Sequence, residues 1–591
     1  MRSPFFRNQV KRFLEANGLR MESLDAYYAY TDDSGALLAG AGIAGDVLKC
    51  LAVSQEVRSE GLLVPLVSRI VSEHPGENLK IFTKPEYQAV FESLGFHLIA
   101  QASLAVLLEN GRGLEKYCEY LQSHVRPGKS GVIVMNANPF TLGHLYLIQK
   151  AAQQVDTLYV IPVKEDVSEF PYAERCEMIR AAASAGLAAE EPTAEENYFS
   201  QGFAKNQFSS ANAMPTRKGT IIVLEGSDYI ISAATFPTYF LKDLSAVSET
   251  QMQLDLDLYQ RWIAPALGTT VRFVGSEPFD ALTQRYNQLI PNAVVIPRKD
   301  EISASKVREV INKGVFRNAA MMCPVTTWPY LLAALAERAL RIELDTPGKP
   351  GLVGPDGAGA HKDMDYDIML RGIKALRPFW SRIAMAGSAQ ELRQLGIEAE
   401  AAMMAATGGV NTHRGAIFAL GLALNAAWSV YRDVQNTDNQ KDMQILLRKI
   451  ATEVLHNHLK DNNLHITALR GTRRMAAEGY RELFENWLPF YRSAKTEEEH
   501  RFSGASALFF ATEKPTGPSA ELKTLLRIMS TLDDTCVVHR VGEERAQKVK
   551  EEAGEIADSI GHLCERYAQE GISPGGAADM LSLTIFINSI L

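Results

Sequence analysis

The chain is poor in cysteine, with six in 591 residues. None of them belongs to a C-x-x-C pair, and such pairs are typical of structural zinc sites and redox motifs. Disulfide frameworks are typical of short secreted chains that cannot build a large core. The cysteine pattern therefore disfavours both a zinc site and a disulfide scaffold, and it suits a reducing compartment.

Long apolar runs and long basic blocks are also missing. The most apolar stretch, Gly415 to Val430, has only Asn425 and Ser429 as clearly polar residues. It is shorter than the ~20 residues of a membrane-spanning helix, so we expect a buried core helix. The first residues are amphipathic and lack the apolar core of a signal peptide. The net charge of −9 disfavours nucleic acid as a partner. These features predict a cytoplasmic enzyme with no membrane or nucleic-acid partner.

Length and pattern together predict three domains. Before Pro324, short β-branched runs alternate with helical segments, whereas helical periodicity dominates after Pro350. We expect an α+β domain over 1–115, an α/β Rossmann-like domain over 116–328 and an all-α domain over 329–591. A helical passage is expected to join the last two domains. The polar stretch 188–220 has no sustained period and is expected to be an insertion, either a lid or a solvent-exposed loop.

The first predicted domain contains a strand end followed by a turn with Arg58 and Gly61 and then a helix. Later, a helix closed by Gly95 leads into a short strand. This pair of segments resembles the acetyltransferase fold, in which an R-x-x-G turn holds the pyrophosphate of acyl-CoA. A domain that has lost this activity and packs on its neighbour is favoured over an active acetyltransferase.

The stretch GVIVMNANPFTLGHLYLIQK, from Gly131 to Lys150, predicts a strand, a tight turn and a helix. The turn places Thr141, Gly143 and His144 at a helix start, where unpaired N–H groups and the helix dipole favour phosphate. A histidine there can stabilise charge that develops on phosphoryl oxygens. The pattern indicates nucleotidyl transfer, and a simple helix cap is the alternative.

A second segment has the same design. The apolar run Ala293 to Ile296 is followed by EISASKVR, in which Ser303, Ser305 and Arg308 stand at a helix start. A serine cap with a solvated arginine is the alternative. Two such helix starts in one α/β region favour a phosphate-binding function.

These words resemble the nucleotidyltransferase superfamily, with its H-x-G-H and I-S-S-T-x-x-R signatures. Thr141 stands where many members have the first histidine. The longer words NANPFTLGH, VKEDVSEFPYAER and EGSDYIISAATFPTYFLKD are similar to the citrate lyase ligase family over about residues 1–330. The resemblance implies that ATP adenylates acetate, followed by acetyl transfer to the prosthetic-group thiol of the citrate lyase acyl carrier protein. We assign His144 and Thr141 to catalysis. Nucleotide binding is assigned to Asn138, Gly143, Lys164, Arg175, Ser303, Ser305 and Arg308.

The predicted all-α domain has polar turns that helix formation does not require. The glycine-rich turn near Pro350 leads to His361, Asp363 and Asp365, and such carboxylates can hold Mg²⁺ when phosphates supply the other ligands. An acidic helix start is the alternative. The other turns contain Gly408, Gly409, Asn411, His413 and Arg414, then Asp533, Asp534, His539 and Arg540, and last SPGGAAD, in which Asp579 is either functional or a first-turn charge.

The words GKPGLV, GAHKDMD, ATGGVNTHRGAIF, LDDT and SPGGAADML resemble the triphosphoribosyl-dephospho-CoA synthase family over about 325–591. The resemblance implies that dephospho-CoA attacks the ribose of ATP, that adenine leaves, and that Mg²⁺-ATP is bound. Where relatives usually read RGARGEA, this chain has Arg474 in place of the next glycine. We assign Glu400 as the proton acceptor and the two aspartate pairs, Asp363 with Asp365 and Asp533 with Asp534, to the metal. Nucleotide binding is assigned to Gly408, Gly409, Asn411, His413, Arg414, His539 and Arg540.

The two resemblances use different residues and point to one target, so we expect a bifunctional enzyme that matures citrate lyase. Its partners would be acetate, dephospho-CoA and the acyl carrier protein, with ATP and Mg²⁺ as cofactors. The alternatives are a single nucleotidyltransferase, similar to pantetheine-phosphate adenylyltransferase, with a non-catalytic helical domain, or a scaffold with decayed sites. Acceptor specificity and ATP consumption separate them.

Overall fold

The computed structural model describes residues 3–188, 219–230, 236–241, 247–269, 271–276, 281–298, 302–432, 439–461, 469–503, 518–555 and 560–591. Most of the predicted insertion, 188–220, lies outside these residues. The chain divides into two compact units. The first contains Met1–Asn138, Gly143–Ala188 and Met214–Glu301, and the second contains Ile302–Leu591 together with the short turn Pro139–Leu142.

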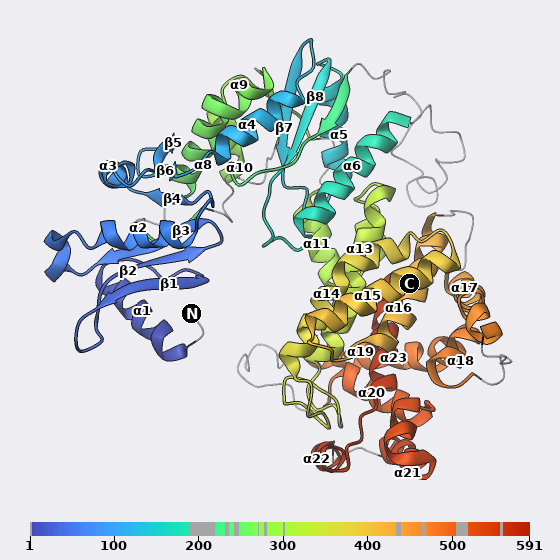
Figure 1. The fold of residues 1–591 in the computed structure, drawn as a ribbon. Coiled ribbons are helices and arrows are strands. Elements are labelled where there is room, and N and C mark those ends of the chain that lie inside the picture. Colours follow the sequence, from blue (N-terminus) through green and yellow to red (C-terminus); the bar gives the residue numbers. More distant parts are fainter. Residues whose placement is uncertain are drawn as a thin grey trace. The chain divides into compact units, whose positions relative to one another are not determined.

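The first unit begins with a six-stranded sheet in the order β1-β2-β3-β4-β6-β5 (Figure 1). Neighbouring strands are antiparallel except β3 and β4, which run parallel and pair at only two positions. The strands are β1 (Ala26–Thr31), β2 (Leu37–Ala44), β3 (Val47–Val53), β4 (Lys80–Thr83), β5 (His97–Gln101) and β6 (Val106–Glu109). The accompanying helices are α1 (Pro4–Ala16), α2 (Leu63–Glu73), α3 (Gln88–Glu92) and α4 (Gly113–Ser123).

A five-stranded parallel sheet follows in the order β11-β10-β7-β8-β9. Every residue of β8 is buried, as expected for an apolar strand covered on both faces. The strands are β7 (Ser130–Met135), β8 (Thr157–Pro162), β9 (Thr220–Val223), β10 (Val271–Gly275) and β11 (Ala293–Ile296). The helices are α5 (Leu142–Ala152), α6 (Tyr172–Ala188), α8 (Val247–Leu258), α9 (Ala264–Leu267) and α10 (Ala281–Leu289).

The two sheets of the first unit share a hydrophobic core. Phe82 and Leu107 of the first sheet belong to the same buried cluster as Tyr159 of the second sheet and Tyr229. Helix α4 also runs across the boundary predicted at residue 115. Residues on both sides of that boundary therefore stabilise each other, and the three-domain division stays a prediction.

The described residues of the second unit from Ile302 onward form helices, with one isolated β-bridge between Gly354 and Gly357. The predicted helical passage is confirmed as α13, and the predicted buried helix is confirmed as α16, which is mostly buried. No described helix is long and apolar enough to cross a membrane. The helices are α11 (Ala304–Asn312), α12 (Phe316–Ala320), α13 (Trp328–Asp345), α14 (Tyr366–Ala384), α15 (Ala389–Ala406), α16 (Arg414–Arg432), α17 (Asn439–Asp461), α18 (Gly471–Ala477), α19 (Leu488–Ser503), α20 (Ala520–Thr531), α21 (Thr535–Glu555), α22 (Ile560–Glu570) and α23 (Gly575–Ile590).

Candidate functional sites

The predicted strand, turn and helix around His144 are observed as β7, a six-residue loop and α5. Ala137 in the loop has a φ of +50°, a conformation that non-glycine residues seldom adopt outside tight turns or functional loops. The side-chain oxygen of Asn138 accepts a hydrogen bond from the Phe170 N–H at 3.1 Å. Thr141 is buried. The loop is thus fixed by its own side chains immediately before the helix that carries His144.

His144 lies in the first turn of α5, next to Gly143. Burial, and secondarily the positive charge of Arg298, lower the pKa of His144 to about 4. At neutral pH the imidazole is therefore uncharged and can donate one N–H. A bound phosphate would oppose the effect of Arg298, because a nearby negative charge favours the protonated ring.

Arg175, predicted to bind nucleotide, is fully buried. Its guanidinium donates to the carbonyl oxygens of Asn136 and Val163, each at 2.9 Å. It also donates to the carbonyls of Phe170 and Glu165 and pairs with the Glu165 carboxylate at 3.4 Å. These contacts hold the loops after β7 and β8 together and give Arg175 a positioning role. Its predicted contact with the nucleotide stays a prediction.

Lys164 is half exposed and lies 3.6 Å from Asp228. An exposed lysine after β8 is compatible with a phosphate ligand, because exchanging such an exposed carboxylate partner costs little. Its predicted nucleotide contact stays a prediction.

The second predicted helix start is observed at α11, directly after β11 and a short connection. The Ser303 hydroxyl accepts the Lys306 N–H at 3.1 Å, so Ser303 is the helix N-cap. Arg308 donates to the Ser305 hydroxyl at 3.2 Å. His144 belongs to the first unit and these three residues to the second, and their meeting at one nucleotide stays a prediction.

In the second unit, sequence motifs that are far apart in the chain lie close together and form one polar centre. His361 and Ser573 share a hydrogen bond of 2.7 Å between Nε2 and Oγ. Any side chain at Gly415 would collide with the Asp579 carboxylate. The Asp534 carboxylate accepts the Ala577 N–H at 2.9 Å. The words GAHKDMD, NTHRG, LDDT and SPGGAAD therefore build one site.

His413 is part of this centre and is 3% exposed. Its Nδ1 bonds to the Thr412 hydroxyl at 2.7 Å, whereas its buried Nε2 has no hydrogen-bond partner among the residues that the structure describes. Burial, and then the nearby Lys349 ammonium, lower the pKa of His413 to about 3. The imidazole is therefore neutral at physiological pH and lies in the interior. Its predicted nucleotide contact stays a prediction.

The residues next to His413 serve the helix start of α16. The Asn411 side-chain oxygen accepts the Arg414 N–H at 3.1 Å, and Gly408 and Gly409 both have positive φ. Arg414 pairs with Glu400, the predicted proton acceptor. This pairing occupies one oxygen of the Glu400 carboxylate.

Three carboxylates surround the start of α23. Burial raises the pKa of Asp579 well above its usual range, and the nearby Asp534 and Glu343 carboxylates add to this effect. Glu343 in turn pairs with the buried Lys349 at 2.5 Å. The sequence left Asp579 undecided and did not single out Glu343 or Lys349, although a lysine in the word GKPGLV was a visible signal.

The structure does not gather the four predicted metal ligands into one group. Asp365 caps α14 by accepting the Ile368 N–H at 2.8 Å, and Asp363 lies 3.8 Å from His361. Both oxygens of Asp534 accept backbone N–H groups. In the described part of the chain, no cluster of three or more histidine, cysteine or acidic side chains could hold a metal. Mg²⁺ needs only one or two carboxylates when phosphates complete its shell, and the exposed Asp533 fits that lesser role.

The last two predicted nucleotide ligands lie on α21. His539 is exposed, and Arg540 donates to the Gly571 carbonyl at 3.4 Å. Neither is held in the interior, so both remain candidates for a surface contact.

Comparisons with known proteins give both parts of the chain a family. Residues 130–191 and 215–331 match the family model described as citrate lyase ligase C-terminal domain, and residues 329–591 match ATP:dephospho-CoA triphosphoribosyl transferase. The citrate (pro-3S)-lyase ligase of Escherichia coli (strain K12) is 35% identical over 352 residues, which cover 55% of this chain and 89% of that protein. The 2-(5''-triphosphoribosyl)-3'-dephosphocoenzyme-A synthase of Klebsiella pneumoniae is 33% identical over 282 residues, covering 44% and 94%.

The chain belongs to both families. The segments that match the citrate lyase ligase family include β7, α5 and α11. The segment that matches the triphosphoribosyl transferase family includes the polar centre of the helical unit. The two matches overlap only at residues 329–331.

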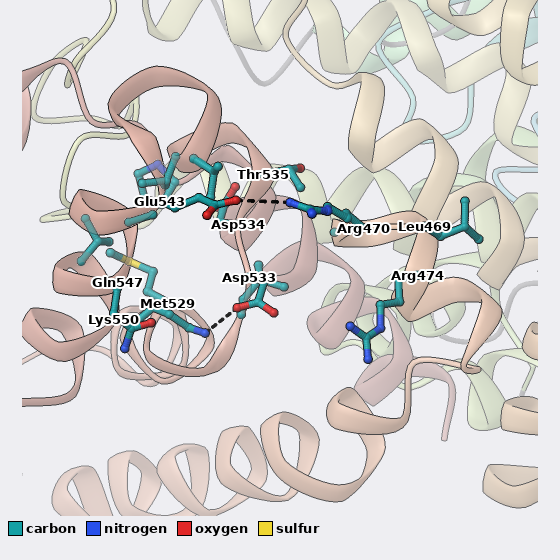
Figure 2. Close-up of a pocket in the computed structure, with 17 residues that line it drawn as sticks. Leu469, Arg470, Arg474, Met529, Asp533, Asp534, Thr535, Glu543, Gln547 and Lys550 are labelled. Atoms are coloured by element: carbon teal, nitrogen blue, oxygen red, sulfur yellow. Dashed lines mark hydrogen bonds and ion pairs between the residues drawn. The ribbon is translucent and has the colours of Figure 1, made fainter. Parts of the chain in front are cut away.

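The transferase-family segment contains a pocket of about 520 Å³ (Figure 2). Arg470 and Arg474 line it together with Asp533, Asp534 and Lys550. The motif LDDT and the segment RGTRR, residues 470–474, therefore both line this cavity. Arg474 places a charged side chain at its wall.

We expect stability of the second unit to fall in acid because His413 is buried as a neutral group. Its folded-state pKa, about 3, lies below the unfolded value of about 6.5. The unfolded chain therefore binds the extra proton between these pH values. The free energy of unfolding should drop by up to ~1.4 kcal/mol per pH unit as pH falls through this window. Urea unfolding of H413Q between pH 7 and 4.5 should show a shallower dependence, and an unchanged slope would contradict the assignment. H539Q, which changes an exposed side chain, is the control.

Asp534→Asn is expected to destabilise the second unit by about 1–3 kcal/mol. Asp534 accepts the Cys536 N–H at 2.8 Å and the Ala577 N–H at 2.9 Å. These two hydrogen bonds link the start of α21 to the start of α23. An amide nitrogen in place of one oxygen would face a donor with a donor. Denaturant unfolding monitored by circular dichroism measures the loss, with the exposed neighbour D533N as control. Equal stability of the two variants would contradict this structural role of Asp534, whose predicted role as a metal ligand stays a prediction.

Proposed function

We propose that the chain matures citrate lyase through two ATP-dependent reactions. One is the citrate (pro-3S)-lyase ligase reaction, and the other makes 2'-(5''-triphosphoribosyl)-3'-dephospho-CoA. The observation that carries the proposal is the adjacent match of two families in one chain, each covering about nine-tenths of a relative named for the corresponding activity. A match along all of 329–591 argues against a non-catalytic helical domain.

In the ligase reaction, an acetate oxygen attacks the α-phosphorus of ATP, and pyrophosphate leaves. The prosthetic-group thiol of the acyl carrier protein then attacks the acetyl carbonyl, loses its proton and displaces AMP. His144 would donate its N–H to the phosphoryl oxygens as their charge increases. Ser303, Ser305 and Arg308 at α11 would bind the same phosphates, while Arg175 keeps the surrounding loops in place.

In the transferase reaction, the 2'-hydroxyl of dephospho-CoA attacks C1' of the ATP ribose. The bond from C1' to the adenine nitrogen breaks, adenine takes up a proton, and the triphosphate stays on the product. Glu400 is our candidate acceptor for the hydroxyl proton. Bound Mg²⁺ would neutralise triphosphate charge, with Asp533 as its protein ligand.

We further propose an acetyltransferase-like fold for 1–115 and a Rossmann-like nucleotidyltransferase fold for 116–328. The single parallel pair β3 and β4 within an otherwise antiparallel sheet supports the first assignment. The all-parallel second sheet, with His144 just beyond the carboxyl end of β7, supports the second.

The test is to incubate the full chain with ATP and dephospho-CoA and to follow adenine and the triphosphoribosyl adduct by mass spectrometry. A second incubation with ATP, acetate and labelled pyrophosphate measures exchange. We expect both activities. An acceptor that is a phosphate monoester in place of acetate would favour a pantetheine-phosphate adenylyltransferase-like enzyme, and no ATP consumption in either mixture would favour a scaffold.

A further inference from the structure

The pocket of the helical unit has cationic side chains from two helical segments. Arg470 and Arg474 come from the start of α18, and Lys550 comes from α21. Figure 2 shows the two arginines on one side of the pocket and Lys550 with Glu543 on the other. Thr535 adds a hydroxyl where α21 begins. Three cations around a cavity of nucleotide size are more than the fold of this region requires.

Each of these cations has a carboxylate partner that a stronger anion can replace. Arg470 lies 3.3 Å from Glu543, and both side chains are 79% exposed. Arg474 pairs with Glu478 on its own helix at 2.9 Å, and Lys550 pairs with the exposed Asp533 at 2.7 Å. Exposed pairs of this kind contribute little. A phosphate oxygen offers more charge, and an arginine can bind it in bidentate fashion.

We propose that this pocket binds the polyphosphate chain of the transferase's ATP, with Arg470, Arg474 and Lys550 as its ligands. The proposal rests on the proposed function, in which the triphosphate stays attached from substrate to product. A group that is never released needs a site that holds it throughout the reaction. Three cations facing one cavity match three phosphates better than the diphosphate of dephospho-CoA.

Hydrogen–deuterium exchange of the full chain with inorganic tripolyphosphate tests the location directly. Peptides covering 469–478 and 533–550 should exchange more slowly in its presence. Dephospho-CoA alone should leave these peptides unchanged. Exchange is read peptide by peptide, so binding of tripolyphosphate to the ligase half does not interfere. Protection by dephospho-CoA in place of tripolyphosphate, or no protection by either, would overturn the proposal.

Matched variants separate recognition from general charge. R474Q and K550Q should each weaken tripolyphosphate protection of these peptides by about tenfold in midpoint concentration. R481Q and K548Q are the controls, because Arg481 and Lys548 make the same kind of exposed pair with Glu485 and Glu544 but do not line the pocket. Equal midpoints in all four variants would overturn the proposal. Adenine release by the unmodified chain is measured in parallel, so a misplaced site is distinguished from an absent reaction.

Discussion

His144→Ala should lower acetate-dependent ATP–pyrophosphate exchange by about 10²–10³-fold, because it removes a preorganised donor worth about 2.7–4 kcal/mol in the transition state. The structure places the ring at the start of α5 behind a loop fixed by Asn138. Because its pKa is lowered to about 4, the imidazole is a neutral hydrogen-bond donor in the protein without ATP. H144Q keeps an N–H and should recover part of the rate.

The adenine-releasing reaction of the same protein is an internal control, because its residues lie in the transferase-family segment. H97A changes an exposed histidine on β5 and should exchange pyrophosphate normally. Near-normal exchange in folded H144A would remove His144 from the ligase mechanism. Equal loss in H144A and H144Q would instead indicate that the charged imidazolium is required.

Arg175→Met should lower the free energy of unfolding of the first unit by about 3–5 kcal/mol. The variant keeps the volume of the side chain but leaves the carbonyls of Asn136 and Val163 without their donor. The buried Glu165 carboxylate also loses its cationic partner, although the N–H groups of Val167 and Ser168 still donate to it. We expect the urea midpoint to fall and ligase activity to fall with it, since both loops meet at this guanidinium.

R180M is the matched control, because Arg180 lies on the same helix α6 but is half exposed and pairs with Glu225. The double variant R175M/E165Q should recover part of the lost stability, because it removes the unpaired buried charge. A stable R175M that has lost ATP binding would instead support the sequence-based prediction that Arg175 is a nucleotide ligand.

The sequence was sufficient where the signal was local. The apolar run Val132 to Met135 predicted β7, and the serine of EISAS predicted a helix start that the structure has at Ser303. The apolar stretch from Gly415 predicted the buried α16. Each of these depends on periodicity or capping within about twenty residues, which the sequence displays directly.

The sequence did not reveal which charged or titratable side chains are buried by segments far away in the chain. Arg175 ends a polar sequence segment typical of phosphate ligands, yet the loops that follow β7 and β8 enclose its side chain. His413 was assigned to nucleotide binding from its local segment, which did not show that folding places it beside Lys349, more than sixty residues earlier in the chain. Asp365 caps the start of α14, which agrees with the acidic helix start that was left open as the alternative.

The packing of α11 and α12 has a consequence for how this gene can be divided. Both helices lie in the ligase-family match but fold in the second unit, where Phe316 packs on Tyr431 with ring centroids 4.7 Å apart, and Arg338 donates to the Asn312 carbonyl at 2.9 Å. A split at residue 329 would expose Tyr431 and separate α11 from its support. Splitting the reading frame there would therefore not give two intact halves, and a cell that translates the undivided chain makes both segments in a fixed one-to-one ratio.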